Sequence, residues 1–261
     1  MEKGYSFFKK ARLAAFAIMA FTFSGTAAQL EVTTEPGTLA SLISENDKWN
    51  TTELKVSGPI NAIDIRTLRE MAGSDYYGEP TEGKLQKLDM TDVEIIGYDE
   101  STPSVDQSYF CDTMQGFVYL IAEDNKFYGF FFTECDALKE LTLPVRAFYE
   151  GSREWPEMLE KISVPEENPY LTVLDNILYS KDLKTLYYCP SGSPQTTIRT
   201  PDATEIIYKY AFYSNQHVQS VEMPNVKEIK SPAFTYCAAL QQLSFGNQLT
   251  TLEEMSIFGN F

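Results

Sequence analysis

The chain has 261 residues, of which 43% are hydrophobic and 22% are charged, and its formal net charge is −16. This apolar fraction is sufficient for a buried core and excludes an intrinsically disordered chain. So acidic a chain repels the phosphates of nucleic acids, and it carries no basic arm that would offset the repulsion. Nucleic-acid binding is therefore excluded.

Residues 1–28 have the three parts of a secretory signal peptide. Basic residues precede an apolar run at 13–23, and small residues follow up to Ala28. A membrane anchor would need about 20 apolar residues, and a lipoprotein would need a cysteine directly after the cleavage point, whereas the first one is Cys111. We expect cleavage after Ala28, no membrane insertion of the cleaved chain, and a location at the cell surface, in the periplasm or outside the cell.

Residues 29–125 indicate a small region of mixed helices and strands. The apolar spacing predicts helices at 38–48 and 63–71. A strand is expected at 53–56, and residues 85–90 and 93–95 are expected to form another strand and its turn. Residues 97–116 are rich in Asp, Ser and Pro and are typical of a loop.

A short pattern recurs from residue 141 onwards. Each copy places two inward positions around one polar residue and ends at a proline or, in the last copy, a glycine. The copies begin at Leu141, Ile162, Ile198, Val221 and Leu243, with spacings of 21, 36, 23 and 22 residues. The alternation predicts short half-buried strands, and the prolines end them. Most of the spacings fit the roughly 20–29 residues of a leucine-rich repeat.

Other positions of the unit recur in register with these strands. They are an aromatic anchor (Phe132, Phe212, Phe234), a Cys or Asn (Cys135, Asn215, Cys237) and a Glu-Ile pair (Glu205-Ile206, Glu228-Ile229). A single unit cannot bury its apolar side chains, but stacked units form a continuous core. The expected fold is therefore an α/β-poor repeat solenoid, a right-handed stack with short parallel strands at 126–261, and a small αβ capping region at 29–125.

The 36-residue interval between Ile162 and Ile198 contains an insertion. Residues 177–182 and 183–187 predict a β-hairpin with its turn at 180–182. We expect this hairpin, near 175–190, to project from the stack rather than to break it.

This organisation resembles the BspA-type leucine-rich repeats of bacterial surface and secreted proteins. The resemblance is carried by Glu228-Ile229, Ala233-Phe234 and the segment 237–240, by a sister copy at 205–224, and by the hairpin at 168–184. Asn215 replaces the family's usual Cys in one copy, and Glu134 and Tyr236 stand where Gly is common. The resemblance covers residues 126–261.

The resemblance implies an exported, non-catalytic protein-binding module, and some members of the family are adhesins for extracellular-matrix proteins such as fibronectin and fibrinogen. The alternative is a secreted scaffold or self-associating surface component, because the last repeat starts near Leu252 and stops at Phe261, leaving a strand edge that invites pairing. A carbohydrate-active enzyme is the remote alternative.

The candidate binding face follows from the strand alternation. The residues that flank each central inward position point outward together: Glu140, Thr142, Lys161, Ser163, Thr197, Arg199, Ser220, Glu222, Gln242 and Ser244. Tyrosines offer a second set of contact residues, because Tyr combines a large area with a polar tip. These are Tyr179, Tyr187, Tyr188, Tyr208, Tyr210, Tyr213 and Tyr236.

The sequence contains no motif for catalysis, for a cofactor or for a metal. His217 is the single histidine, and its place in the repeat predicts a solvent-facing side chain. The acidic clusters at 89–94, 99–100 and 166–167 are interpreted as solvated loop charge. The aromatic run at 127–132 is interpreted as core packing, because Phe132 aligns with repeat anchors.

Cys135 and Cys237 occupy the same position of different repeats. Four strand steps of about 4.8 Å separate them by roughly 19 Å, whereas a disulfide needs Cα atoms within about 7 Å. Both are therefore expected to be free and buried. Whether Cys111 pairs with Cys189 stays open.

Overall fold

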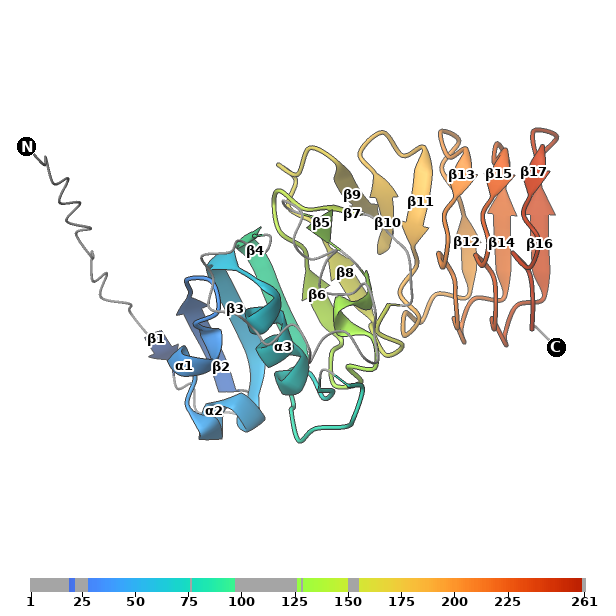
Figure 1. Cartoon of the computed structure of the whole chain (residues 1–261). Helices are drawn as coiled ribbons and strands as arrows, with labels where there is room; N and C mark the ends of the chain where they lie inside the picture. The colour runs from blue at the N-terminus through green and yellow to red at the C-terminus, as the bar shows by residue number, and fades with distance from the viewer. Residues whose placement is uncertain are drawn as a thin grey trace, which may run out of the picture.

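The computed structural model describes residues 19–21, 28–75, 77–96, 126–127, 129–149 and 155–259. Most of the expected signal peptide lies outside these ranges, as do the expected loop at 97–116, Cys111 and the acidic pair at 99–100. The strands follow one another along a single long axis, from the blue N-terminal part to the red C-terminal end (Figure 1). In the described segments, none of the helices has the length and apolar character needed to span a bilayer.

We call the sheets that contain the five predicted repeat strands the front sheets, and the sheet that packs behind the last of them the rear sheet. The first front sheet contains six strands in the order β1-β2-β3-β4-β6-β8. Their bounds are β1 Met19–Phe21, β2 Ala28–Thr33, β3 Thr51–Ile60, β4 Lys87–Ile95, β6 Glu140–Thr142 and β8 Lys161–Ser163. Strand β1 pairs antiparallel with β2, and all later pairs are parallel. The register aligns one inward row from strand to strand, made of Leu54, Leu88, Leu141 and Ile162, each at most 2% exposed.

Helices pack beside the first strands of this sheet (Figure 1). They are α1 (Leu39–Leu42), α2 (Glu45–Asn50) and α3 (Ala62–Met71). The helix expected at 63–71 is confirmed as α3, which begins with a capping box between Asn61 and Asp64. The single helix expected at 38–48 is wrong in detail, because Ser44 accepts a hydrogen bond from the N–H of Asp47 and starts a second helix there.

Two strand predictions for this region need correction. Residues 93–95, which were expected in a turn after the strand at 85–90, continue that strand, so that β4 runs without a break from Lys87 to Ile95. Strand β2 was not predicted from the sequence. The strand expected at 53–56 is confirmed within the longer β3.

The C-terminal part has two narrow sheets that face each other across a core. The second front sheet has the order β12-β14-β16, and the rear sheet has the order β17-β15-β13-β11-β10-β9. Their bounds are β9 Leu171–Leu174, β10 Ile177–Ser180, β11 Thr185–Tyr188, β12 Thr197–Arg199, β13 Ile206–Ile207, β14 Ser220–Met223, β15 Glu228–Ile229, β16 Gln242–Phe245 and β17 Thr251–Leu252. A separate two-stranded sheet pairs β5 (Lys126–Phe127) with β7 (Phe148–Tyr149), and a short 3-10 helix, η1, spans Gly129–Phe132.

The five strands expected from the recurring pattern are confirmed as β6, β8, β12, β14 and β16. The predicted anchors Phe132, Phe212 and Phe234 are fully buried. The alignment of Glu205-Ile206 with Glu228-Ile229 is wrong by one residue, because the rear sheet pairs Ile206 with Glu228 and Ile207 with Ile229. The segment from Arg199 to Ile206 is one residue longer than the equivalent segment from Glu222 to Glu228. The spacing between repeats is therefore 23 residues in the front strands and 22 in the rear strands at this point.

The hairpin near 175–190 does not project from the stack. Its strands β10 and β11 pair antiparallel and belong to the rear sheet. On its other side, β11 pairs in parallel with β13 of the repeats. Neighbouring side chains of β10 enter different cores: Leu178 packs in the core of residues 30–188, while Ile177 and Tyr179 pack in the core of residues 177–237. Alternation along a strand places successive side chains on opposite faces. The hairpin therefore lies between two cores and contributes to both.

The turn between β9 and β10 also occupies the interval between the two front sheets. Asp175 and Asn176 adopt positive φ values of 50° and 61°. The Asn176 side chain accepts a hydrogen bond from the N–H of Ile162 at 3.1 Å and donates to the carbonyl of Glu160 at 2.8 Å. These two bonds satisfy backbone groups of β8 and its flank that a following parallel strand would otherwise pair with. The front sheet is interrupted here, contrary to the expectation.

The Cys-or-Asn position of the repeat connects one unit to the preceding one. Asn215 is fully buried, accepts hydrogen bonds from the N–H groups of His217 and Val218, and donates to the carbonyl of Pro190. In the next copy the Cys237 thiol donates to the carbonyl of Phe212 at 2.9 Å. A buried amide or thiol at this position thus pairs backbone groups that the stack removes from water.

The residue before each of these positions adopts a left-handed conformation. Glu134, Ser214 and Tyr236 have φ values of 63°, 54° and 60°. Glycine adopts such a backbone without steric cost, which explains why the repeats tolerate Gly at this place. Gly259 has a φ of 70° at the same position of the last repeat.

Candidate binding surface

The ten residues of the predicted face occupy equivalent places on their strands, and none of them is buried. In the first front sheet the register pairs Glu140 with Lys161 and Thr142 with Ser163. In the second front sheet it forms two rows, Thr197-Ser220-Gln242 and Arg199-Glu222-Ser244. The structure therefore brings four of the residues together on one sheet and six on the other, with the Asp175–Asn176 turn in the interval between the sheets.

A row of alternating charges crosses the first front sheet. The Lys87 ammonium lies 3.4 Å from the Glu53 carboxylate and 3.6 Å from that of Glu140, which is itself 3.6 Å from the Lys161 ammonium. The carboxylate of Glu140, followed by that of Glu53, raises the pKa of Lys87. Only Glu140 and Lys161 of this row were in the predicted set. Glu53 and Lys87 were missed because the strand register, and no short motif, aligns them.

A second charged group corrects the interpretation of the acidic cluster at 89–94. Asp89 and Asp92 lie on β4 and not in a loop. The Asp92 carboxylate lies 3.1 Å from the ammonium of Lys55 on the neighbouring β3, and a hydrogen bond to Asp92 raises the pKa of that lysine. By contrast, Glu166 and Glu167 are exposed outside the strands, as expected.

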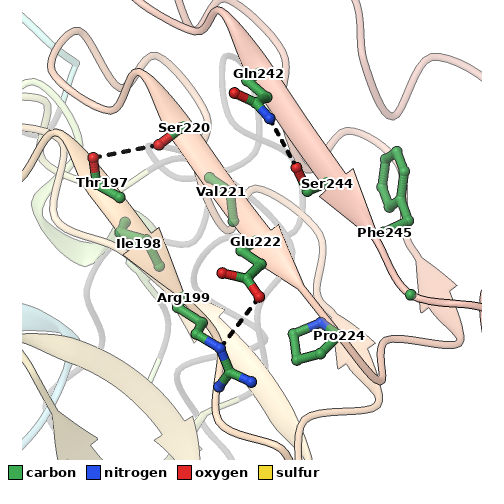
Figure 2. Close-up of a pocket in the computed structure, with 11 residues that line it drawn as sticks. Thr197, Ile198, Arg199, Ser220, Val221, Glu222, Pro224, Gln242, Ser244 and Phe245 are labelled. Carbon is green, nitrogen blue, oxygen red and sulfur yellow. Dashed lines mark hydrogen bonds and ion pairs between the residues drawn. The ribbon is translucent and has the colours of Figure 1, made fainter.

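A shallow groove of about 500 Å³ crosses the second front sheet (Figure 2). The Arg199 guanidinium lies in it and pairs with Glu222 of the next strand at 3.3 Å and with Asp202 at 2.9 Å. Phe245, whose side chain is 41% exposed, and Pro224 line the end of the groove. The groove thus combines two rows of polar side chains with an apolar end.

The tyrosine set divides into buried and accessible members. Tyr179 and Tyr188 are each 1% exposed, so their prediction as contact residues is wrong. Tyr236 is 48% exposed, and Tyr187, Tyr208, Tyr210 and Tyr213 are half-buried. The rings of Tyr210, Tyr213 and Tyr236 follow one another edge-to-face, with centroids 5.3 and 5.6 Å apart.

The reactive side chains of the described segments are either exposed singly or buried. His217 is exposed, as expected. Cys135 and Cys237 are free and buried, as expected, and so is Cys189. Burial raises the pKa of the Cys135 and Cys237 thiols to about 12. Among the described residues, no three His, Cys, Asp or Glu side chains are grouped so that they could hold a metal ion.

Residues 127–132 pack in the core, as expected for the members whose side chains are described. Phe127, Phe131 and Phe132 are at most 2% exposed. The aromatic run therefore offers no platform for a ligand at these three positions.

A family model described as "BspA type Leucine rich repeat region" matches six copies in residues 186–260. These residues are BspA-type leucine-rich repeats. The resemblance inferred from the sequence is confirmed, although the expected range of 126–261 is wider than the matched one. Comparison with curated protein sequences gave no significant match.

Several solved structures resemble the chain. The pneumococcal vaccine antigen PcpA is 17% identical with a TM-score of 0.49, and the alignment covers 94% of this chain and 72% of that one. A leucine-rich repeat protein from Eubacterium ventriosum is 15% identical with a TM-score of 0.44, covering 92% and 76%. A leucine rich cell surface protein from Faecalibacterium prausnitzii is 16% identical with a TM-score of 0.46, covering 98% and 80%.

Proposed function

We propose that the chain is an exported, non-catalytic binding module that holds a host or extracellular-matrix protein on its front face. In this proposal the repeats form a solenoid, and the αβ region at 29–125 caps it. The groove of about 500 Å³ on the second front sheet is the observation that carries the proposal. Short parallel strands present two rows of outward side chains there, and stacked repeats commonly bind partners on such extended surfaces.

The chemistry of the groove suits a protein ligand. Arginine and aromatic side chains dominate the binding energy of many protein interfaces. The groove is lined by Arg199 on β12 and by Phe245 on β16, the two outer strands of the second front sheet. The ion pair of Arg199 with Glu222 is half-exposed, at 51% and 56%. An exposed pair contributes only about 0–1 kcal/mol to folding, so both side chains are available to a partner at little cost in stability.

Immobilised fibronectin, fibrinogen and collagen test the proposal in physiological salt. We expect saturable binding to one of them and at least a tenfold loss for the double variant Arg199→Ala/Glu222→Ala. The matched control is Glu228→Ala/Lys230→Ala, which removes an ion pair of 3.5 Å from the rear sheet. Equal losses in both variants, or binding that neither variant changes, would contradict the front-face assignment.

A second candidate function, self-association, is favoured by apolar side chains at the end of the stack near β17. Five of them are 39–57% exposed: Phe245, Leu252, Met255, Ile257 and Phe258. Exposed apolar groups that lie together favour association. Analytical ultracentrifugation tests this function: an oligomer that forms with rising concentration and is lost in Leu252→Asp/Phe258→Asp supports it. The control variant Met158→Asp changes a side chain that is 46% exposed elsewhere.

A further inference from the structure

A second groove, of about 590 Å³, lies on the side of the hairpin and is built from other elements than the front face. Strand β7 contributes Phe148 and Tyr149, the segment just before β9 contributes Tyr170, and the β10–β11 turn contributes Lys181 and Asp182. This volume falls within the roughly 300–1,000 Å³ of small-molecule sites. The groove shares no lining residue with the groove of the front face.

Two pairs of aromatic rings line the groove. Phe148 meets Tyr170 edge-to-face with ring centroids 5.8 Å apart, and Tyr149 meets Tyr187 in the same manner at 5.2 Å. Tyr170 is 55% exposed, whereas Tyr149 is 6% exposed and forms part of the floor. The face of an aromatic ring carries a partial negative charge, which attracts polarised C–H groups such as those on the apolar face of a sugar ring.

A hydrogen-bond donor and an acceptor on consecutive residues, Lys181 and Asp182, line the same groove as these rings. The Lys181 ammonium donates to the carbonyl of Glu166 at 2.7 Å, and it has further N–H groups to offer. One oxygen of Asp182 accepts from the Ser180 hydroxyl at 2.7 Å and from the N–H of Lys184 at 3.1 Å. These bonds fix the turn, and they lower the pKa of Asp182, the Ser180 bond most, so that it stays an anionic acceptor at neutral pH.

We propose that this hairpin groove binds a neutral oligosaccharide. Sugar hydroxyls both donate and accept hydrogen bonds, so an ammonium and a carboxylate that line the same groove can satisfy different hydroxyls of one ligand. The same pair has no net charge and therefore favours neither an anionic nor a cationic ligand. The ring of Tyr170, which is 55% exposed, provides a place on which one sugar ring can stack, and the half-buried Tyr187 lies in the same groove.

Trp155 provides a reporter for binding in this groove. Its indole N–H donates to the Tyr149 hydroxyl at 3.0 Å, and the two rings lie 5.3 Å apart. The chain has two tryptophans, so Trp49→Phe leaves Trp155 as the single tryptophan, which can be excited selectively over tyrosine. The probes are lactose, maltotriose, cellotriose, mannotriose and chitotriose, with saturation-transfer NMR on the unchanged chain as a second measurement.

We expect saturable binding of at least one of these sugars with a dissociation constant below 10 mM as an order-of-magnitude limit, since a shallow groove contributes few contacts. Tyr170→Ala should weaken binding at least tenfold. Asp182→Asn should weaken it about fivefold, because Asn keeps one acceptor for the turn but loses the charge that strengthens hydrogen bonds. The control Tyr236→Ala, at a tyrosine that is 48% exposed on another part of the stack, should bind as the unchanged chain does.

Three outcomes would overturn the proposal. The first is no saturable binding in either measurement, and the second is binding that Tyr170→Ala leaves unchanged. For the third, a heparin tetrasaccharide and an oligolysine peptide serve as charged comparison probes, and binding of one of these without binding of any neutral sugar would contradict the proposal. The double variant Arg199→Ala/Glu222→Ala should keep its sugar binding. Failure of the front-face proposal and failure of this one are therefore distinguishable.

Discussion

The N-terminal and C-terminal parts of the chain close their cores in different ways. In the first part, strands of up to 10 residues, such as β3, carry helices beside them, and α3 buries Leu68 and Met71 against the sheet. In the second part, strands of two to four residues form two narrow sheets, and the core lies between them. A long strand with its own helix can bury a core locally, whereas a two-residue strand depends on its neighbours in the stack.

The comparison explains why the front face has two different characters. The first front sheet carries a row of paired charges from Glu53 to Lys161, which neutralise one another. The second carries mixed polar side chains around Arg199 and an apolar end at Phe245. Arg199 is paired as well, with Glu222 and Asp202, so the difference between the two sheets lies in the apolar end of the groove. Aromatic groups such as Phe245 contribute strongly to binding once a partner removes them from water. The repeats, rather than the helical part, therefore carry the proposed partner site.

The largest expected effect is on the second core. Phe234 stacks on Phe212 with ring centroids 4.6 Å apart, and both rings are fully buried. Phe234→Ala should destabilise the chain by about 3–5 kcal/mol, because it leaves a cavity. The matched variant Leu68→Ala in the first core should cost about 2–5 kcal/mol.

Urea unfolding, followed by tryptophan fluorescence and by circular dichroism, measures both changes. The hairpin contributes to both cores, so the two probes should report one shared transition in each variant. A Phe234→Ala variant that loses circular dichroism before its tryptophan signal changes would show that the cores unfold independently.

The next effect concerns a buried carboxylate of the helical part. Asp64 is 1% exposed and accepts hydrogen bonds from the N–H groups of Gly37, Leu39 and Asn61. Burial raises its pKa, and these donors oppose the increase. Asp64→Ala should cost about 3 kcal/mol, because it leaves buried donors unpaired, as read from the urea midpoint. Asp47→Ala, which removes a half-buried carboxylate of α2 that accepts a hydrogen bond from the Ser44 hydroxyl, should cost less, about 1 kcal/mol.

A smaller effect should follow from the turn in the interval between the front sheets. Asn176→Ala removes hydrogen bonds to Ile162 and Glu160 and places alanine at a φ of 61°. We expect a loss of about 2 kcal/mol in the free energy of unfolding. Asn176→Gly keeps the backbone conformation available and should recover about 1 kcal/mol of it. Equal stabilities of both variants and the unchanged chain would mean that the turn does not tie the two sheets.

The smallest effect should be a gain. Ser214 has a φ of 54°, and its N–H donates to the carbonyl of Thr235. Ser214→Gly keeps that bond, relieves the left-handed strain and should add about 0.5–1 kcal/mol to the free energy of unfolding. Ser220→Gly, on strand β14, should instead lower it by a similar amount. Thermal unfolding of both variants provides the measurement, and a loss in both would contradict the strain argument.

The sequence predicted the repeating strands and their buried anchors well, because alternation and a closing proline are local signals. The pattern around Val221 placed Glu222 outward and Met223 inward, as the structure has them. The pattern could not predict the offset in the rear sheet. The front strands β12 and β14 are 23 residues apart, from Ile198 to Val221, whereas the rear strands β13 and β15 are 22 residues apart, from Ile207 to Ile229. Loop lengths between strands change this offset without any local signature.

The position of the hairpin was harder to predict, although one signal was present. Ile177, Leu178 and Tyr179 are three consecutive apolar residues, and such a run is typical of a strand that is buried on both faces. A projecting hairpin would have shown alternation instead. The charged row of the first front sheet had no local signal, since Glu53 and Lys87 meet only through the register of β3 and β4.

Photo-crosslinking most directly tests the claim that the front face of the repeats binds a protein. A benzoylphenylalanine at Gln242 of β16 and another at the exposed Lys209, which follows β13 of the rear sheet, are compared on bound fibronectin, fibrinogen or collagen. The account predicts a crosslink from position 242 and none from position 209. A crosslink from position 209 alone would contradict it and would place the partner on the rear sheet.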